Sequence, residues 1–152
     1  MNMDDQSQYQ PSGVPQPEIP AEPNTPVSNG KMVLCIEDEY FISELYVRAL
    51  VKAGYQVNTV IDGPAGLAEA KTNQYDIILL DIMLPNMSGL DILHELKDPT
   101  KTPNFKSKII ITTNLDQSED NRGTVESQAD GYIVKAEITP RQLVEFLQQL
   151  AV

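Results

Sequence analysis

Three acidic side chains directly follow two short apolar runs of the chain. Glu37 and Asp38 come after Met32–Ile36, and Asp81 comes after Ile77–Leu80. If these runs are neighbouring parallel strands, the three carboxylates converge at one edge of a sheet. Like charges so close are unfavourable unless a cation compensates them, and accessible carboxylate oxygens suit Mg²⁺, which keeps several of its waters. The pattern favours a metal site over ordinary N-caps of the following helices.

A lysine and two threonines end two further apolar runs. Lys135 follows Tyr132–Val134, and Thr112 and Thr113 follow Ile109–Ile111. On the same rim as the carboxylates, these groups complete a set suited to phosphoryl transfer. A carboxylate is the nucleophile, a metal ion and an ammonium neutralise phosphoryl oxygens, and a hydroxyl donates a hydrogen bond.

Two other arrangements for phosphoryl transfer do not fit the spacing. The chain has no GxxxxGK[ST] loop for a nucleotide. A hydrolase of the haloacid-dehalogenase type needs a second Asp two residues after its nucleophile, and Met83 occupies that position after Asp81. His94 is the only histidine and lies among Asp91, Glu95 and Lys97, which indicates a surface residue.

The composition excludes several classes of protein. Acidic residues outnumber basic ones by 22 to 11, which gives a formal net charge of −11 and argues against direct binding to nucleic acid or anionic membranes. No run approaches the ~18–20 apolar residues of a membrane span, and no signal peptide opens the chain. We therefore expect a cytoplasmic protein. Cys35 is the only cysteine, which rules out an internal disulfide and favours a small buried residue over a reactive thiol.

The first 30 residues differ from the rest of the chain. They carry six prolines among Gln, Ser, Asn and Glu, with few large apolar residues: Pro11, Pro15, Pro17, Pro20, Pro23 and Pro26. Such a segment buries too little surface to offset its ordering entropy, which predicts a disordered tail over residues 1–30. One folded domain is expected over residues 31–152, a usual domain size.

Apolar runs and helical spacings alternate along that domain. The runs described above, together with Val57–Ile61, predict five buried parallel strands. The segments between them have helical spacing, and each has apolar residues expected to be buried. These are Ile42, Leu45, Ala49 and Ala53 in the first segment, Leu67 and Ala70 in Pro64–Thr72, Leu90, Leu93 and Leu96 in Gly89–Lys97, and Leu143, Phe146, Leu147 and Leu150 in the last. Thr139 caps this last helix, and Pro140 begins it.

The fourth expected helix, Ser118–Gln128, is poorly suited to helix formation. It contains Gly123 among several polar residues, and only Val125 and Ala129 are apolar anchors. A glycine inside a helix costs about 1 kcal/mol relative to alanine. We expect this helix to be the least stable of five. Five strands alternating with five helices predict a doubly wound α/β fold, whose site lies beyond the carboxyl ends of the strands.

Between Lys31 and Leu150 the sequence resembles the receiver domains of two-component response regulators. Three segments carry the resemblance: VLCIEDE at the first strand, DIILLDIMLPNMSGLDIL around Asp81, and GYIVK at the fifth strand. Their order and separations are receiver-like. The resemblance implies a flavodoxin-like sheet with strand order 2-1-3-4-5.

The resemblance also assigns roles to individual residues. Asp81 would be the phosphoacceptor, and Glu37, Asp38, Asp81 and the backbone carbonyl of Met83 would bind Mg²⁺. Lys135 would contact the phosphoryl group.

A hydroxyl and an aromatic ring would form the switch. Tyr132 would be the rotating aromatic residue. Thr113 lies 22 residues before Lys135, the usual receiver separation, so it is favoured over Thr112 as the switch hydroxyl.

Three positions depart from the family pattern. Glu37 replaces the commoner Asp, which the family tolerates. Asn114 replaces a usual Ala and either alters phosphoryl access or bonds into its loop. Ala136 replaces a Pro that normally follows a cis peptide bond after Lys135. A non-proline cis bond costs about 2.5–4 kcal/mol, which leaves a trans bond with a shifted loop, or a cis bond held by its surroundings.

The resemblance implies a signalling protein rather than an enzyme with external substrates. A histidine kinase or histidine phosphotransfer protein would donate the phosphoryl group, and the signal would pass by contact with an unknown downstream protein. The chain would be a monomer or a phosphorylation-dependent dimer. The alternative is a receiver-like interaction module that works without phosphorylation, and a metal-dependent phosphatase is a weaker third interpretation.

Overall fold

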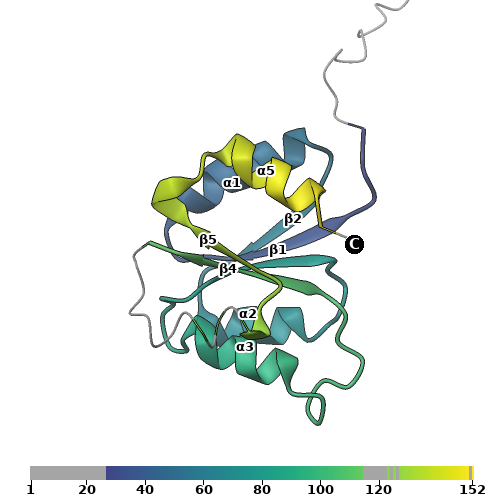
Figure 1. The fold of residues 1–152 in the computed structure, drawn as a ribbon, viewed down its shortest axis with the longest axis vertical. Coiled ribbons are helices and arrows are strands. Elements are labelled where there is room, and N and C mark those ends of the chain that lie inside the picture. Colours follow the sequence, from purple (N-terminus) through teal and green to yellow (C-terminus); the bar gives the residue numbers. More distant parts are fainter. Residues whose placement is uncertain (1–26, 115–122, 124, 126, 151) are drawn as a thin grey trace, which may run out of the picture.

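Five parallel strands form one sheet in the order β2-β1-β3-β4-β5 (Figure 1). The computed structural model describes residues 27–114, 123, 125, 127–150 and 152. The strands are β1 (Met32–Ile36), β2 (Gln56–Val60), β3 (Ile77–Asp81), β4 (Lys108–Thr113) and β5 (Gly131–Val134). This is the flavodoxin-like order, and the expected strand positions are confirmed to within two residues at each end.

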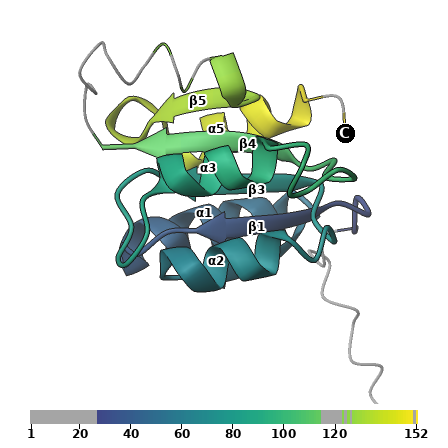
Figure 2. The same cartoon turned by 90° about the horizontal axis from the view of Figure 1, so that it is seen from below.

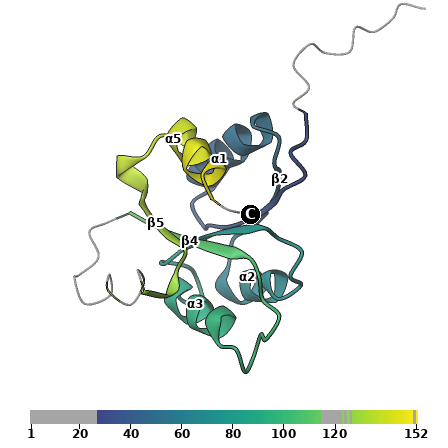
Figure 3. The ribbon, with the colours of Figure 1, turned by 45° about the vertical axis from the view of Figure 1, so that its right-hand side comes forward.

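In the continuously described parts of the chain, four helices cover the two faces of the sheet. They are α1 (Tyr40–Lys52), α2 (Gly63–Ala70), α3 (Gly89–Lys97) and α5 (Pro140–Gln148), with a 3₁₀ turn η2 (Lys135–Glu137) after β5. Helices α1 and α5 lie on one face and α2 and α3 on the other (Figure 3). Seen from below, α2 and α3 lie side by side in front of the sheet (Figure 2).

The central strands are almost wholly apolar because both of their faces are covered. Every residue of β3 is buried, whereas the edge strand β2 is largely exposed. Alternate residues of the inner strands face two separate cores. Leu34, Ile78 and Ile111 belong to the core beneath α2 and α3, and Cys35 and Leu79 to the core beneath α1 and α5.

The helix ends follow the capping signals of the sequence. Thr139 caps α5 with a reciprocal capping box, and Pro140 begins the helix as expected. The Ser88 side chain accepts a hydrogen bond from Asp91 N at the start of α3. Helix α3 has the bounds expected for it.

The buried face of α1 differs from the expected one. Its buried residues are Ser43, Tyr46 and Leu50, while Leu45 is 50% exposed. Of the expected stripe, Ile42 and Ala53 are partly buried against this core, whereas the prediction for Leu45 was wrong because Tyr46 and Leu50 occupy the core against the sheet. Helical spacing alone does not distinguish these two adjacent faces.

The expected helix at 118–128 falls mostly on residues outside the described part of the chain. Gly123, Val125, Ser127 and Gln128 are helical, and Val125 is fully buried. Its expected low stability stays a prediction. The expected tail likewise falls largely outside the described residues, since residues 1–26 are not described.

Candidate functional site

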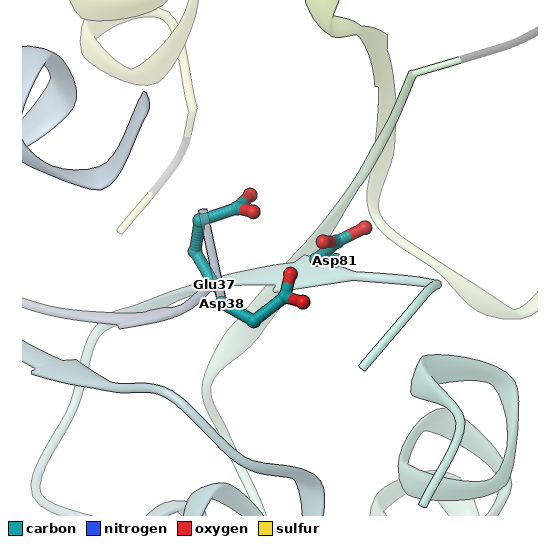
Figure 4. A group of neighbouring side chains, drawn as sticks. All are labelled: Glu37, Asp38 and Asp81. Carbon is teal, nitrogen blue, oxygen red and sulfur yellow. The ribbon is translucent and has the colours of Figure 1, made fainter. Parts of the chain in front are cut away.

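Three carboxylates meet at the carboxyl ends of β1 and β3. These strands are neighbours in register, with Ile36 opposite Leu80, so the residues that follow them lie side by side. Oxygen atoms of Glu37, Asp38 and Asp81 lie within 4.8 Å of one another. Figure 4 shows the three side chains turned toward a common space. Glu37 and Asp81 are buried and Asp38 is exposed, which leaves the cluster accessible from one side.

Lys135 extends into this cluster from the end of β5. Its Nζ lies 2.5 Å from Glu37 Oε2 and 3.2 Å from Asp81 Oδ2. The Lys135 and Glu37 side chains are each 2% exposed. Lysine is rarely buried without a partner, and here it compensates the two buried carboxylates. The sequence prediction that Lys135 shares the rim with the acidic residues is confirmed.

Backbone amides orient the two buried carboxylates. Met83 N donates to Asp81 Oδ1 at 3.1 Å, and Glu39 N donates to Glu37 Oε1 at 3.1 Å. The loop after β3 turns back closely, since Gly89 N donates to Ile82 O at 2.8 Å. Each carboxylate therefore has one oxygen on a backbone amide and the other toward Lys135.

The environment of the cluster shifts its pKa values. Burial raises the pKa of Glu37 to about 7, aided by the nearby Asp81 charge and opposed by Lys135. Burial also raises the pKa of Asp81, opposed chiefly by Lys135. Burial alone would lower the pKa of Lys135, but the charges of Glu37 and Asp81 outweigh it and raise that pKa. Two carboxylates and one ammonium thus leave an excess negative charge in a poorly solvated space.

The cluster fits a hard divalent cation. Among the described residues, Glu37 Oε2 makes no hydrogen bond of regular geometry, although it is buried and close to the Lys135 ammonium. A buried, incompletely satisfied carboxylate oxygen beside an exposed carboxylate offers the oxygen ligands and water access that Mg²⁺ prefers. Met83 lies two residues after Asp81. Its side chain is exposed, so Met83 contributes to the site through its backbone.

The two threonines at the end of β4 face opposite sides of the sheet. Thr112 is in register with Asp81 and with Ile133, which belongs to the core beneath α1 and α5. Thr113 is one residue further and therefore faces the other side, as do Ile111 and its partner Tyr132. Both threonines are buried. Because Thr113 shares this face with Tyr132, its hydroxyl rather than that of Thr112 is the one that would couple to the ring.

The peptide bond between Lys135 and Ala136 is trans, since no cis bond occurs among the described residues. The chain instead forms the η2 turn, Lys135–Glu137, before α5 begins. Of the two possibilities left by the sequence, the trans bond is the one present, and Lys135 still reaches the carboxylates.

One polar contact near the site had no signal in the sequence. Asn114 Nδ2 donates to Glu39 Oε1 at 2.6 Å, across 75 positions of the chain. The sequence marked Asn114 as a departure from the family pattern but did not identify its partner. Glu39 was absent from the expected site altogether.

The remaining polar candidates are not members of the cluster. His94 is exposed on α3, as expected for a surface residue. Cys35 is buried, and burial raises the pKa of its thiol to about 12, which makes it an inert core residue. Within the described ranges, the helices are all too short or too polar to cross a bilayer.

Comparison with known proteins agrees with this geometry. The sequence model of the response regulator receiver domain matches residues 33–148. Response regulator ArlR of Staphylococcus saprophyticus is 38% identical over 103 residues, which make up 68% of this chain and 44% of ArlR. The probable transcriptional regulatory protein TcrX of Mycobacterium tuberculosis is 34% identical over 103 residues, 42% of its length. The chain thus spans less than half the length of these two relatives.

Solved structures share the fold. The chemotaxis protein CheY4 of Vibrio cholerae superimposes with a TM-score of 0.67 at 26% identity, covering 80% of this chain and 98% of CheY4. A CheY-like receiver domain protein of Methanospirillum hungatei gives a TM-score of 0.66 at 28% identity, covering 78% of this chain and 91% of that protein. With five parallel strands in the same order and an acidic cluster at their ends, the chain belongs to the response regulator receiver domain family of two-component signalling.

Proposed function

We propose that Asp81 accepts a phosphoryl group from the phosphohistidine of a histidine kinase or a histidine phosphotransfer protein. The observation that carries the proposal is the meeting of Glu37, Asp38, Asp81 and Lys135 at the ends of three strands. A carboxylate oxygen of Asp81 attacks phosphorus, the phosphorus–nitrogen bond breaks, and the imidazole leaves with the electron pair. The chain catalyses only its own phosphorylation and dephosphorylation.

The residues around Asp81 prepare it for this step. Met83 N and Lys135 Nζ hold the two oxygens of its carboxylate in place. The buried ammonium of Lys135 balances charge that passes to the phosphoryl oxygens, where a poorly solvated site strengthens the interaction. Glu37, Asp38, Asp81 and the Met83 carbonyl would hold Mg²⁺. When bound, the ion neutralises phosphoryl charge.

The response begins at the end of β4. The Thr113 hydroxyl donates a hydrogen bond to the new phosphoryl group, and the space that it leaves admits the half-buried ring of Tyr132, which faces the same side. The rearrangement alters the surface around β5 and α5, where a downstream protein binds. The coupling free energy of such a change is typically about 1–3 kcal/mol.

The surface beside the site suits a protein donor. Helix α1 begins directly after Glu39, and its first turns expose Tyr40 and Phe41, at 69% and 79%, and Leu45 at 50%. An exposed apolar patch of this kind is typical of a protein contact. A donor helix that packs on it would bring a phosphohistidine to the rim of the sheet.

Incubation with acetyl phosphate and Mg²⁺ tests the proposal. Intact-mass measurement should show the gain of one phosphoryl group that is stable in acid and labile in base. Asp81→Asn should abolish the gain, and Asp91→Asn, at an exposed position on α3, should retain it. A mass gain that persists in Asp81→Asn, or none in the parent chain, would contradict the proposal. The interaction module that works without phosphorylation has no support from the comparisons.

A further inference from the structure

The hydrogen bond between Asn114 and Glu39 crosses the end of β3. Glu39 lies between β1 and α1, and Asn114 follows β4. Because β3 lies between β1 and β4 in the sheet, a side-chain link between the residues that follow these two strands spans the strand end that carries Asp81. The distance of 2.6 Å is that of a short, charge-assisted hydrogen bond.

Both ends of this link are tied to residues of the site. Glu39 N donates to Glu37 Oε1, so Glu39 is fixed to the buried carboxylate beside Lys135. Asn114 is covalently joined to Thr113, the last residue of β4. The link therefore connects the acidic loop directly with the end of the strand that carries the switch hydroxyl.

We propose that the Glu39–Asn114 hydrogen bond is a strap that holds the end of β4 in its unphosphorylated position and slows the phosphorylation of Asp81. This inference rests on the proposed function of Asp81. The new phosphoryl group draws the Thr113 hydroxyl toward Asp81. Asn114 then moves with Thr113, and its hydrogen bond to Glu39 breaks. The strap is therefore present only in the unphosphorylated state.

An interaction made in one state only shifts the equilibrium and the rate. In the reaction with acetyl phosphate, an Asp81 oxygen attacks phosphorus, the bond from phosphorus to the acetate oxygen breaks, and acetate leaves with the electron pair. The strap must open before or during this step. In hydrolysis, water attacks phosphorus and the Asp81 carboxylate leaves, starting from a state in which the strap is already open.

Four variants test the strap: Asn114→Ala, Glu39→Ala, the double variant, and Glu39→Gln. Both residues are exposed, so the variants should fold and unfold much as the parent does. Each alanine variant should be phosphorylated by acetyl phosphate about fivefold faster, which corresponds to one hydrogen bond of ~1 kcal/mol. The double variant should match the single ones, because all three lack the same bond.

Glu39→Gln separates the hydrogen bond from the charge. Its amide oxygen can still accept from Asn114, so its rate should stay within about twofold of the parent rate if the strap is the hydrogen bond. If charge repulsion alone were responsible, Glu39→Gln would react as fast as Glu39→Ala. The dephosphorylation rate should change less than the phosphorylation rate in every variant, whereas a simple steric gate over Asp81 would change both equally.

The outcomes distinguish the strap from the proposed function. Three results would overturn the strap while leaving Asp81 as the phosphoacceptor. They are additive effects of the two alanine substitutions on the phosphorylation rate, equal rates in the parent and all variants, and a Glu39→Gln rate equal to that of Glu39→Ala. Absence of phosphorylation in the parent chain would instead overturn the proposed function. A further test needs no phosphodonor. In NMR spectra, the backbone amide resonances of Thr113 and Asn114 should shift in the alanine variants and remain near their parent positions in Glu39→Gln.

Discussion

The ammonium of Lys135 lies 2.5 Å from the Glu37 carboxylate, and both side chains are almost completely buried. This pair joins the two outer strands of the site, since Glu37 follows β1 and Lys135 follows β5. Removing one partner of a buried ion pair leaves an uncompensated charge and costs far more than removing a surface pair. The pair therefore predicts a specific pattern of stability changes.

Lys135→Met should destabilise the domain strongly when Mg²⁺ is absent. It leaves Glu37 and Asp81 buried without their cation, and we expect a loss of about 3–5 kcal/mol in the free energy of unfolding at pH 8. The loss should be smaller at pH 5, because protonated carboxyls need no counter-charge. Denaturant unfolding in EDTA measures both values. Lys101→Met is the matched control, since Lys101 makes an exposed ion pair with Glu95 and should change stability by less than about 1 kcal/mol. Equal losses in the two variants would contradict the role given to Lys135.

The stability of the parent chain should fall as the pH rises toward neutrality in EDTA. Burial raises the pKa of Glu37 from 4.5 to about 7, so between these values the folded state binds more protons than the unfolded state. Stability then decreases with pH, and the contribution of Glu37 is present in full below pH 4.5 and lost as the pH passes through about 7. The raised pKa of Asp81 acts in the same direction.

Thermal unfolding between pH 4.5 and 8 checks this dependence. Glu37→Gln removes the titrating group and should give a flatter profile than the parent chain. Parallel profiles for the two proteins would show that Glu37 titrates normally in the folded state. A parent profile that rises with pH would contradict the prediction outright.

Asp38→Asn should remove stabilisation by Mg²⁺ without weakening the fold. Asp38 is the exposed member of the acidic cluster, so its substitution in EDTA should change the free energy of unfolding by less than about 0.5 kcal/mol. A cation that binds only the folded state raises the midpoint of thermal unfolding. We expect that rise in the parent chain and in Asp91→Asn, and a much smaller one in Asp38→Asn. An unchanged rise in Asp38→Asn would place the ion elsewhere.

Substitution of two glycines by alanine should change the stability of the domain in opposite directions. A Cβ on Gly89 would overlap the backbone of Asp81 and Ile82, which predicts a loss of about 1–3 kcal/mol and a slower phosphorylation of the displaced Asp81. Gly123 is helical and exposed with no atom in the way of a Cβ, so Gly123→Ala should stabilise by up to about 1 kcal/mol. Denaturant unfolding of both variants, with phosphorylation rates, tests the pair. A stabilised Gly89→Ala would refute the close approach at Asp81.

The pattern of apolar and acidic residues predicts which segments form the sheet and where its acidic residues lie. Continuous apolar runs identify buried parallel strands, because both faces of such strands are covered. The residue that follows each run then lies at the carboxyl edge, which places Glu37, Asp38, Asp81 and Lys135 on one rim before any coordinates are known. Local signals also gave the start of α5, since Thr139 and Pro140 act on neighbouring backbone groups.

The pairing of these side chains depends on the folded chain and is not contained in any local pattern. The face of α1 that is buried depends on the shape of the core that receives Tyr46 and Leu50, which helical spacing does not specify. The contact of Asn114 with Glu39 joins positions 75 residues apart, and the close approach of Lys135 to Glu37 joins the ends of β5 and β1, which are not neighbours in the sheet. Sequence patterns report local periodicity and strand ends, whereas such contacts arise from the three-dimensional neighbours that the completed sheet brings together.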